Sequence, residues 1–243
     1  MIKLSKRLKT IAQQIETGQT MADVGTDHGF LSLYLWENGQ CSKVIMTDIS
    51  AGSLQKAIEA FERRFSHSDI HFRLGDGLAP IEEGEVDVVV IAGVGGVLMT
   101  HIFESDLSKT ASFRRYILQP RNGSGKLRYW LDQAGFKIVS ESLAEEGKRV
   151  CEILVVEPPQ CIKARPSLDD YPDEIKYEMP RNLAGKNEKT FKLFINEKLN
   201  IEKQILKAMI DGKTEDIEKK SKIENRIKFL EQIDANSGVI LEA

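Results

Sequence analysis

The regular alternation of short apolar runs with helix-like segments constrains the fold of this chain more than any other sequence feature. After Gly18 the apolar runs have the length of buried strands, and the segments between them keep the spacing of amphipathic helices. We expect strands over 21–24, 44–48, 70–73, 86–92 and 115–119, and helices over 4–16, 30–38, 52–64, 95–105 and 124–134. This βα alternation predicts a mainly parallel sheet with helices on both faces.

The pattern changes after residue 134. Two apolar runs, 136–142 and 151–157, are joined by 143–150, which is too short for a crossover helix. The two runs are therefore expected to pair antiparallel. A parallel sheet that ends in such a hairpin is typical of Rossmann-like methyltransferases and not of dehydrogenases.

The composition changes again beyond the expected hairpin. Residues 157–174 contain four prolines, and two segments with helical apolar spacing follow, separated by the turn DGKTED. The second part is therefore predicted to be a helical hairpin of the antiparallel coiled-coil type. We expect a sheet domain over 1–160, and a linker with a helical-hairpin domain over 161–243.

Bulk properties narrow the classes of partner. The longest apolar run, Val86–Ala92, is far shorter than the roughly 18 residues that a membrane helix needs. The formal charge is -3, so no overall basic excess advertises nucleic-acid binding, although a local patch could serve. Three cysteines without CxxC spacing are typical of reduced thiols, and the histidines lack metal-ligand spacing. We expect a cytoplasmic protein with neither membrane nor metal partner.

The loop after the first strand selects among nucleotide-like ligands. A dinucleotide fingerprint would need glycines at 25, 27 and 30, but the chain has Gly25, Asp27 and Phe30. A carboxylate there would repel a diphosphate, which disfavours NAD, FAD and ATP, and would attract a sulfonium and an ammonium group. The spacing of Asp23, Gly25 and Gly29 fits the D-x-G-x-x-x-G pattern of S-adenosylmethionine-dependent methyltransferases.

Further acids and glycines follow the later strands. Asp48 ends the second expected strand, where an acid usually receives ribose hydroxyls, and Asp76 follows the third, where a side chain can meet the adenine amino group. Each could alternatively be a helix cap. Gly93, Gly95 and Gly96 follow the fourth strand, where they would let a flat ring approach the backbone, or would permit close helix-on-strand packing.

Six stretches taken in order resemble one known family. They are LSKRL, DVGTDHGFL, GDGL, IAGVGG, LQP with LRYWL, and GKRVCEILVVE. The family is the bacterial tRNA (adenine-N1)-methyltransferase family that acts at tRNA position 22, the TrmK family. The resemblance implies a Rossmann-like S-adenosylmethionine domain and a small coiled-coil domain, in agreement with the expected fold.

The resemblance also implies roles for particular residues. It places the cofactor against Gly25, Asp27, Asp48, Asp76, Gly77 and Gly93, to which the loop pattern adds Asp23 and Gly29. It points the target adenine toward Asp27, His28, Gly95, Gly96, Gln119 and Pro120. The chain departs from the family at Phe30, Ser32 and Arg121, where tyrosine, proline and asparagine are common. These departures leave the expected cofactor site in place, and a divergent substrate is an alternative.

Asp27 is the expected catalytic residue. Adenine N1 carries its own lone pair, so positioning does most of the work. A carboxylate near the exocyclic amine would stabilise the positive charge that methylation creates and could later accept the N6 proton. Alternatively, Asp27 only binds the cofactor's ammonium group. His28 could contact a phosphate or the base, or could simply anchor the loop.

Basic residues on the first helix and near the fifth strand are candidate phosphate contacts. They are Lys6, Arg7 and Arg121, with Lys3, Lys9, Arg114, Arg115, Lys126 and Arg128. Each alone could be a solvated surface charge. The helical tail is expected to recognise RNA by shape, and we expect a monomer.

Two other functions remain open. One is a methyltransferase of a small molecule or a protein, with the tail as a dimerisation element. The other is a catalytically silent RNA-binding module, against which the acids at 23, 27, 48 and 76 argue.

Overall fold

A computed structural model describes residues 2–65, 69–183, 187–212 and 216–235 of the chain. It separates into two compact units, which we treat one at a time. The first is drawn from Met1–Ala144 and Cys151–Ala184, and the second from Glu145–Val150 and Gly185–Ala243. No helix in the described ranges is both long and apolar enough to cross a membrane.

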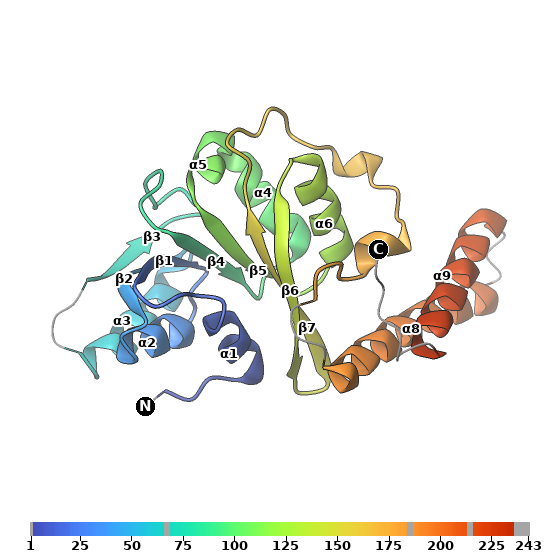
Figure 1. Cartoon of the computed structure of the whole chain (residues 1–243), viewed down its shortest axis with the longest axis horizontal. Coiled ribbons are helices and arrows are strands. Elements are labelled where there is room, and N and C mark those ends of the chain that lie inside the picture. The colour runs from blue at the N-terminus through green and yellow to red at the C-terminus, as the bar shows by residue number, and fades with distance from the viewer. Residues whose placement is uncertain (1, 66–68, 184–186, 213–215, 236–243) are drawn as a thin grey trace. The chain divides into compact units, whose positions relative to one another are not determined.

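A seven-stranded sheet organises the first unit (Figure 1). Its strands are β1 (Gln19–Val24), β2 (Cys41–Asp48), β3 (Ile70–Leu74), β4 (Val88–Ala92), β5 (Arg115–Gln119), β6 (Lys137–Glu146) and β7 (Arg149–Glu157). They lie in the order β3-β2-β1-β4-β5-β7-β6. The first five are parallel, and β7 pairs antiparallel with β5. The predicted mixed sheet with a C-terminal antiparallel hairpin is confirmed.

Helices cover both faces of this sheet because side chains alternate along each buried strand. The helices are α1 (Lys6–Ala12), α2 (Phe30–Glu37), α3 (Ala51–Glu62), α4 (Gly96–Ser105), α5 (Leu107–Ser112) and α6 (Ser124–Gln133). On one face Val44, Val88 and Val90 pack with α1, α2 and α3. On the other face Val89 and Ile91 pack with α4, α5 and α6.

Three elements differ from the sequence-based expectation. The first helix ends at Ala12 and not at residue 16, because the side-chain amide of Gln40 donates to the carbonyls of Ala12 and Ile15, at 2.8 and 2.6 Å. Helix α5 was not expected. The predicted connection 143–150 was wrong in extent, since β6 continues to Glu146 and β7 begins at Arg149, leaving a two-residue turn.

The proline-rich segment packs into the first unit. It contains a short 3-10 helix, η1 (Leu168–Asp170), and α7 (Ile175–Glu178). Ile162 joins the core beneath α4 and α6, and Tyr177 and Met179 are buried. The compact units therefore divide the chain differently from the expected domains, because the predicted linker shares the core of the sheet.

The second unit is a helical hairpin of α8 (Glu188–Asp211) and α9 (Ile217–Ala235), as expected. Ile223, Ile227 and Leu230 are its buried apolar residues on α9, and Arg226 bonds Glu202 across the helices at 2.8 Å. The turn of the β6–β7 hairpin belongs to this unit: Glu197 of α8 accepts the N–H of Val150.

Candidate cofactor and substrate site

The predicted site residues gather at one edge of the sheet. Because the first five strands are parallel, their carboxyl ends share that edge. Asp23 lies near the end of β1, Asp48 ends β2, Asp76 follows β3, Gly93 follows β4 and Gln119 ends β5. The topology thus brings together residues that span almost 100 positions in sequence, as ligand sites of such sheets require.

The loop after β1 is held in place by β2. Gly25 and Thr26 donate their N–H groups to the Thr47 carbonyl at 2.9 and 3.0 Å, and Asp27 N–H donates to Asp48 Oδ2 at 3.2 Å. The other oxygen of Asp48 accepts the N–H of Ser50 at 2.8 Å. The buried Asp48 carboxylate therefore fixes two loops and remains an acceptor at the edge of the site.

Asp23 also holds the loop after β1 in place. Its buried carboxylate accepts hydrogen bonds from Thr26 Oγ1 and Ser32 Oγ, both at 2.9 Å. Burial raises the pKa of Asp23 above its usual range, and the two hydroxyl bonds offset only part of that rise. In this structure Asp23 joins the loop to the start of α2, and a cofactor role for it stays a prediction. Sequence reasoning missed the supporting residues Thr26 and Ser32.

Three side chains of the loop face solvent. Asp27 has a positive φ of 50°, and its side chain is 63% exposed. The His28 side chain is 48% exposed, with its Nε2 3.8 Å from Asp27 Oδ2. The rings of His28 and Phe30 stack with their centroids 5.5 Å apart. Asp27, the expected catalytic residue, is therefore accessible to a substrate.

The predicted cofactor glycines fall into two kinds. At Gly25 and Gly93, both with positive φ, a side chain would meet no atom within 4 Å, so the backbone is open to a ligand. At Gly29 a Cβ would lie 3.0 Å from Met46 Sδ, and at Gly77 it would lie 3.0 Å from Ile102. Packing alone accounts for the second pair, whereas the first pair leaves room along the edge for a bound molecule.

The loops after β4 and β5 are bonded to each other. Gly93 N–H donates to the Gln119 carbonyl at 2.9 Å, and Gly96 N–H donates to the Asn122 carbonyl at 2.8 Å. A Cβ on Gly96 would lie 2.5 Å from the Gly123 carbonyl oxygen, and one on Gly95 would lie 2.9 Å from Asn122 Oδ1. Both glycines therefore pack closely against the loop after β5, and the substrate role expected for them stays a prediction.

The predicted substrate residues Gln119 and Pro120 are buried beside this junction. Arg7 of α1 donates to Gln119 Oε1 at 3.0 Å, and Gln119 Nε2 donates to the Pro120 carbonyl at 2.8 Å. The Arg7 guanidinium therefore supports the end of β5, and the phosphate contact expected of Arg7 stays a prediction. Lys6 and Arg121 have exposed side chains.

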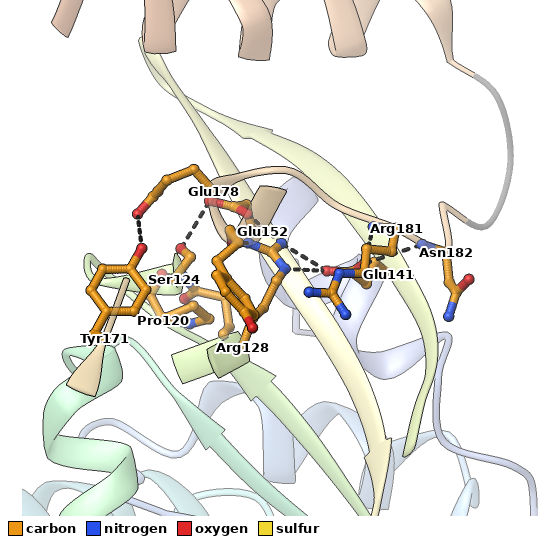
Figure 2. A network of polar contacts seen from close by, with 11 residues as sticks. Pro120, Ser124, Arg128, Glu141, Glu152, Tyr171, Glu178, Arg181 and Asn182 are labelled. Atoms are coloured by element: carbon orange, nitrogen blue, oxygen red, sulfur yellow. Dashed lines mark hydrogen bonds and ion pairs between the residues drawn. The ribbon is translucent and has the colours of Figure 1, made fainter. Parts of the chain in front are cut away.

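Arg128 was expected among the phosphate contacts, and that prediction is wrong. Its side chain is fully buried, donating to Glu141 at 2.8 Å, to Glu152 at 2.5 Å and to the Tyr177 carbonyl at 3.1 Å (Figure 2). Ser124 also bonds Glu152, at 2.8 Å. Burial opposes the charge of Arg128, but the two glutamates outweigh it and hold its pKa above the ordinary value.

Arg115 also lies away from the site. It begins β5 at the opposite edge of the sheet, where it bonds Glu16 at 3.1 Å and Glu157 at 3.3 Å. It is therefore an unsuitable partner for a substrate at the carboxyl edge.

The charge of the site suits a cationic ligand. Within the described residues, Asp27, Asp48 and Asp76 form no ion pair with lysine or arginine, and Asp76 is exposed. The described part of the chain contains no group of three or more acidic, histidine or cysteine side chains able to hold a metal ion. Carboxylates at the ends of neighbouring strands, beside two open glycines, fit a positively charged molecule with hydroxyl and amino groups.

Comparison with known proteins agrees with this chemistry. Residues 4–154 match the family model described as a methyltransferase domain. The tRNA (adenine(22)-N(1))-methyltransferase of Bacillus subtilis is 39% identical over 156 residues, which are 64% of this chain and 66% of that protein.

Solved structures extend the similarity to nearly the whole chain. The crystal structure of the B. subtilis m1A22 tRNA methyltransferase TrmK has a TM-score of 0.76 at 30% identity, covering 96% of this chain and all of that one. A candidate tRNA (m1A22) methyltransferase of Streptococcus pneumoniae, solved with S-adenosyl-L-methionine, has a TM-score of 0.73 at 32% identity, with the same coverage. The chain belongs to the TrmK family of tRNA methyltransferases.

Proposed function

We propose that this protein transfers a methyl group from S-adenosylmethionine to N1 of adenine 22 in tRNA. The observation that carries the proposal is the set of carboxylates at the carboxyl edge, which have no lysine or arginine partner among the residues that the structure describes. The relatives of the chain are named for this reaction. A dehydrogenase would have to bind the diphosphate of its cofactor beside Asp27, and the Asp27 carboxylate would repel that diphosphate.

Residues at the carboxyl ends of β1 to β4, and in the loops that follow them, are proposed to hold the cofactor. Asp48 would accept its ribose hydroxyls and Asp76 its adenine amino group, while Gly25 and Gly93 leave space beside the backbone. When bound, the cofactor supplies a methyl group on a positively charged sulfur atom. Asp23 acts through the loop that it fastens.

Asp27 is proposed to act on the target adenine. Methylation at N1 leaves the ring positively charged, and a carboxylate beside the exocyclic amine stabilises that charge and can accept the N6 proton. The exposed side chain of Asp27 is free to approach the base, while its backbone is fixed by Asp48. Its alternative role is to bind the cofactor's ammonium group.

Substrate tRNA is proposed to contact both units. Lys6 and Arg121 offer exposed cations near the site, and the helical hairpin of the second unit offers a shape-reading surface. We assign transfer chemistry to the sheet domain and RNA contact to the tail, in a cytoplasmic protein. We further propose that the protein is a monomer, which sedimentation of the protein tests.

The decisive experiment supplies labelled S-adenosylmethionine and unmodified tRNA transcripts, and identifies the product by nucleoside mass spectrometry. The wild-type protein is expected to form 1-methyladenosine, and a transcript with guanine at position 22 is expected to stay unmethylated. Asp27→Asn keeps the shape of the side chain and removes its charge. It should lower kcat by about 100-fold, and should change the cofactor Kd by less than about threefold.

Other outcomes select the alternatives. If Asp27→Asn loses cofactor binding, Asp27 is a cofactor ligand. If the wild-type protein binds the cofactor but not tRNA, the substrate is a small molecule or a protein. Binding of tRNA without any transfer would leave a silent RNA-binding module.

A further inference from the structure

One aromatic ring of this protein stands apart from all the others in its exposure. The chain has ten Phe, five Tyr and two Trp residues, all within the described ranges. Phe30 is the only one of them that is exposed, with 51% of its surface accessible. The fold thus forgoes the stabilisation that burying this ring would give.

The exposed ring is held in a defined place. Phe30 is the first residue of α2, and the residues after it, Leu31, Ser32 and Leu33, are buried. The His28 ring stacks on Phe30 at an interplanar angle of 19°. The backbone between the two rings is fixed, because Gly29 packs on Met46. His28 therefore supports Phe30 while half of the phenylalanine remains accessible.

The surroundings of Phe30 are apolar as well as acidic. The exposed large hydrophobic residues of the first unit are Phe30, Ile49, Leu74, Leu98 and Val139. All except Val139 lie at or after the carboxyl ends of β1 to β4. Apolar surface beside carboxylates suits a ligand with flat faces and a polar rim, as a nucleobase has.

We propose that Phe30, supported by His28, is the surface on which the target adenine stacks. The inference rests on the proposed function and adds a substrate-binding residue to it. A base that leaves its place in folded RNA loses its stacking, and an aromatic side chain replaces it. Phe30 offers the face of the base a ring, and Asp27, three residues earlier, offers its exocyclic amine a carboxylate.

The test compares Phe30→Leu, which keeps apolar bulk, with Phe30→Tyr, which keeps a ring. Val139→Ala is the control for an exposed apolar residue away from the site. Phe30→Leu should lower kcat/KM for tRNA about tenfold, whereas Phe30→Tyr and Val139→Ala should stay within about twofold of wild type. The cofactor Kd, measured by calorimetry, should be unchanged in all three.

A second measurement reports stacking without turnover. In a tRNA with 2-aminopurine at position 22, fluorescence is quenched when the extruded base stacks on a ring. The complex with Phe30→Leu should therefore be brighter than the wild-type complex. Equal brightness and equal kcat/KM would overturn the inference, and a weaker cofactor Kd in Phe30→Leu would assign the ring to the cofactor instead. A wild-type protein inactive on every tRNA would remove the proposed function, and this inference with it.

Discussion

Two clusters of carboxylates in the first unit differ in what neutralises them. Around α6, the Glu141 and Glu152 side chains surround a guanidinium that the chain itself supplies, Arg128. At the carboxyl edge of the sheet, Asp27, Asp48 and Asp76 have no lysine or arginine partner within the described residues. The first cluster is complete as it stands and connects elements of the fold. The second becomes neutral only with a cationic ligand, which is the mark of a binding site.

The two clusters also differ in how the backbone uses them. The Arg128 cluster joins α6, β6, β7 and the segment that contains Tyr177 and Arg181. The backbone N–H of Arg181 donates to Glu141 (Figure 2). At the edge, the Asp48 carboxylate bonds the loops that follow β1 and β2. Acids of the first cluster should therefore affect stability most, and acids of the second should affect ligand binding most.

Removing Arg128 should have the largest effect. Arg128→Met leaves two buried carboxylates without a partner and should lower the free energy of unfolding by about 3–5 kcal/mol. Urea unfolding followed by circular dichroism measures it. Arg115→Met is the matched control, since that arginine also bonds two glutamates, but at the surface; it should cost about 1 kcal/mol or less. Equal losses in the two variants would contradict the distinction.

The outline of the site could be predicted from sequence because it follows from strand order. Once the strands are parallel, an acid at the end of each one must lie at the same edge. The positions of Asp48 and Asp76 could therefore be predicted without knowledge of side-chain contacts. The position of Asp27 in the loop after β1 followed from the strand pattern in the same way. These inferences required only local pattern and topology.

Features that depend on distant partners were missed. Arg128 reads as an ordinary surface arginine on a helix, and only Glu141, Glu152 and Tyr177, which lie 13 to 49 residues away, explain its burial. The full length of β6 and β7 was missed because the residues nearest the turn, Glu145, Glu146 and Arg149, are charged. There Glu145 is bonded by Thr190, and Val150 by Glu197, both from α8.

A substitution at Asp48 tests the cluster at the carboxyl edge. Asp48→Asn removes a charged acceptor and should raise the cofactor Kd by about tenfold or more. The cost to folding should be about 1 kcal/mol, because hydrogen bonds from two N–H groups are weakened. Calorimetric titration and urea unfolding separate the two effects.

Asp87→Asn is the control for that change. Asp87 precedes β4 at the opposite edge, where it accepts hydrogen bonds from Thr20 N and Oγ1 at 2.9 and 2.8 Å. It should lose similar stability and leave the cofactor Kd unaltered. A weaker Kd in Asp87→Asn would mean that binding responds to general loosening of the sheet, and not to the acid at the site.

Ser32→Ala should destabilise the protein with a characteristic pH dependence. Ser32 bonds the buried Asp23, and burial raises the pKa of that carboxyl above its ordinary value. Folding therefore favours protonated Asp23, and this contribution to stability is present below the unfolded pKa and lost as pH rises through the folded pKa. Above that pKa the Ser32 hydroxyl supports a buried anion, worth about 1.5–3 kcal/mol, and below it a neutral acid, worth about 0.5–1.5 kcal/mol.

The destabilisation by Ser32→Ala should consequently grow as the pH rises from about 4 through the folded pKa of Asp23. Ser124→Ala provides the comparison, because Ser124 also bonds a buried carboxylate, that of Glu152. There the Arg128 guanidinium stays charged and bound throughout this range, so the loss should be similar at both ends. Urea unfolding at several pH values decides between them. Parallel pH profiles for the two alanine variants would show that the Arg128 guanidinium does not alter the pH dependence of a buried acid. Divergent profiles would show that a buried acid without such a hydrogen-bonded cation, Asp23, makes stability depend on pH.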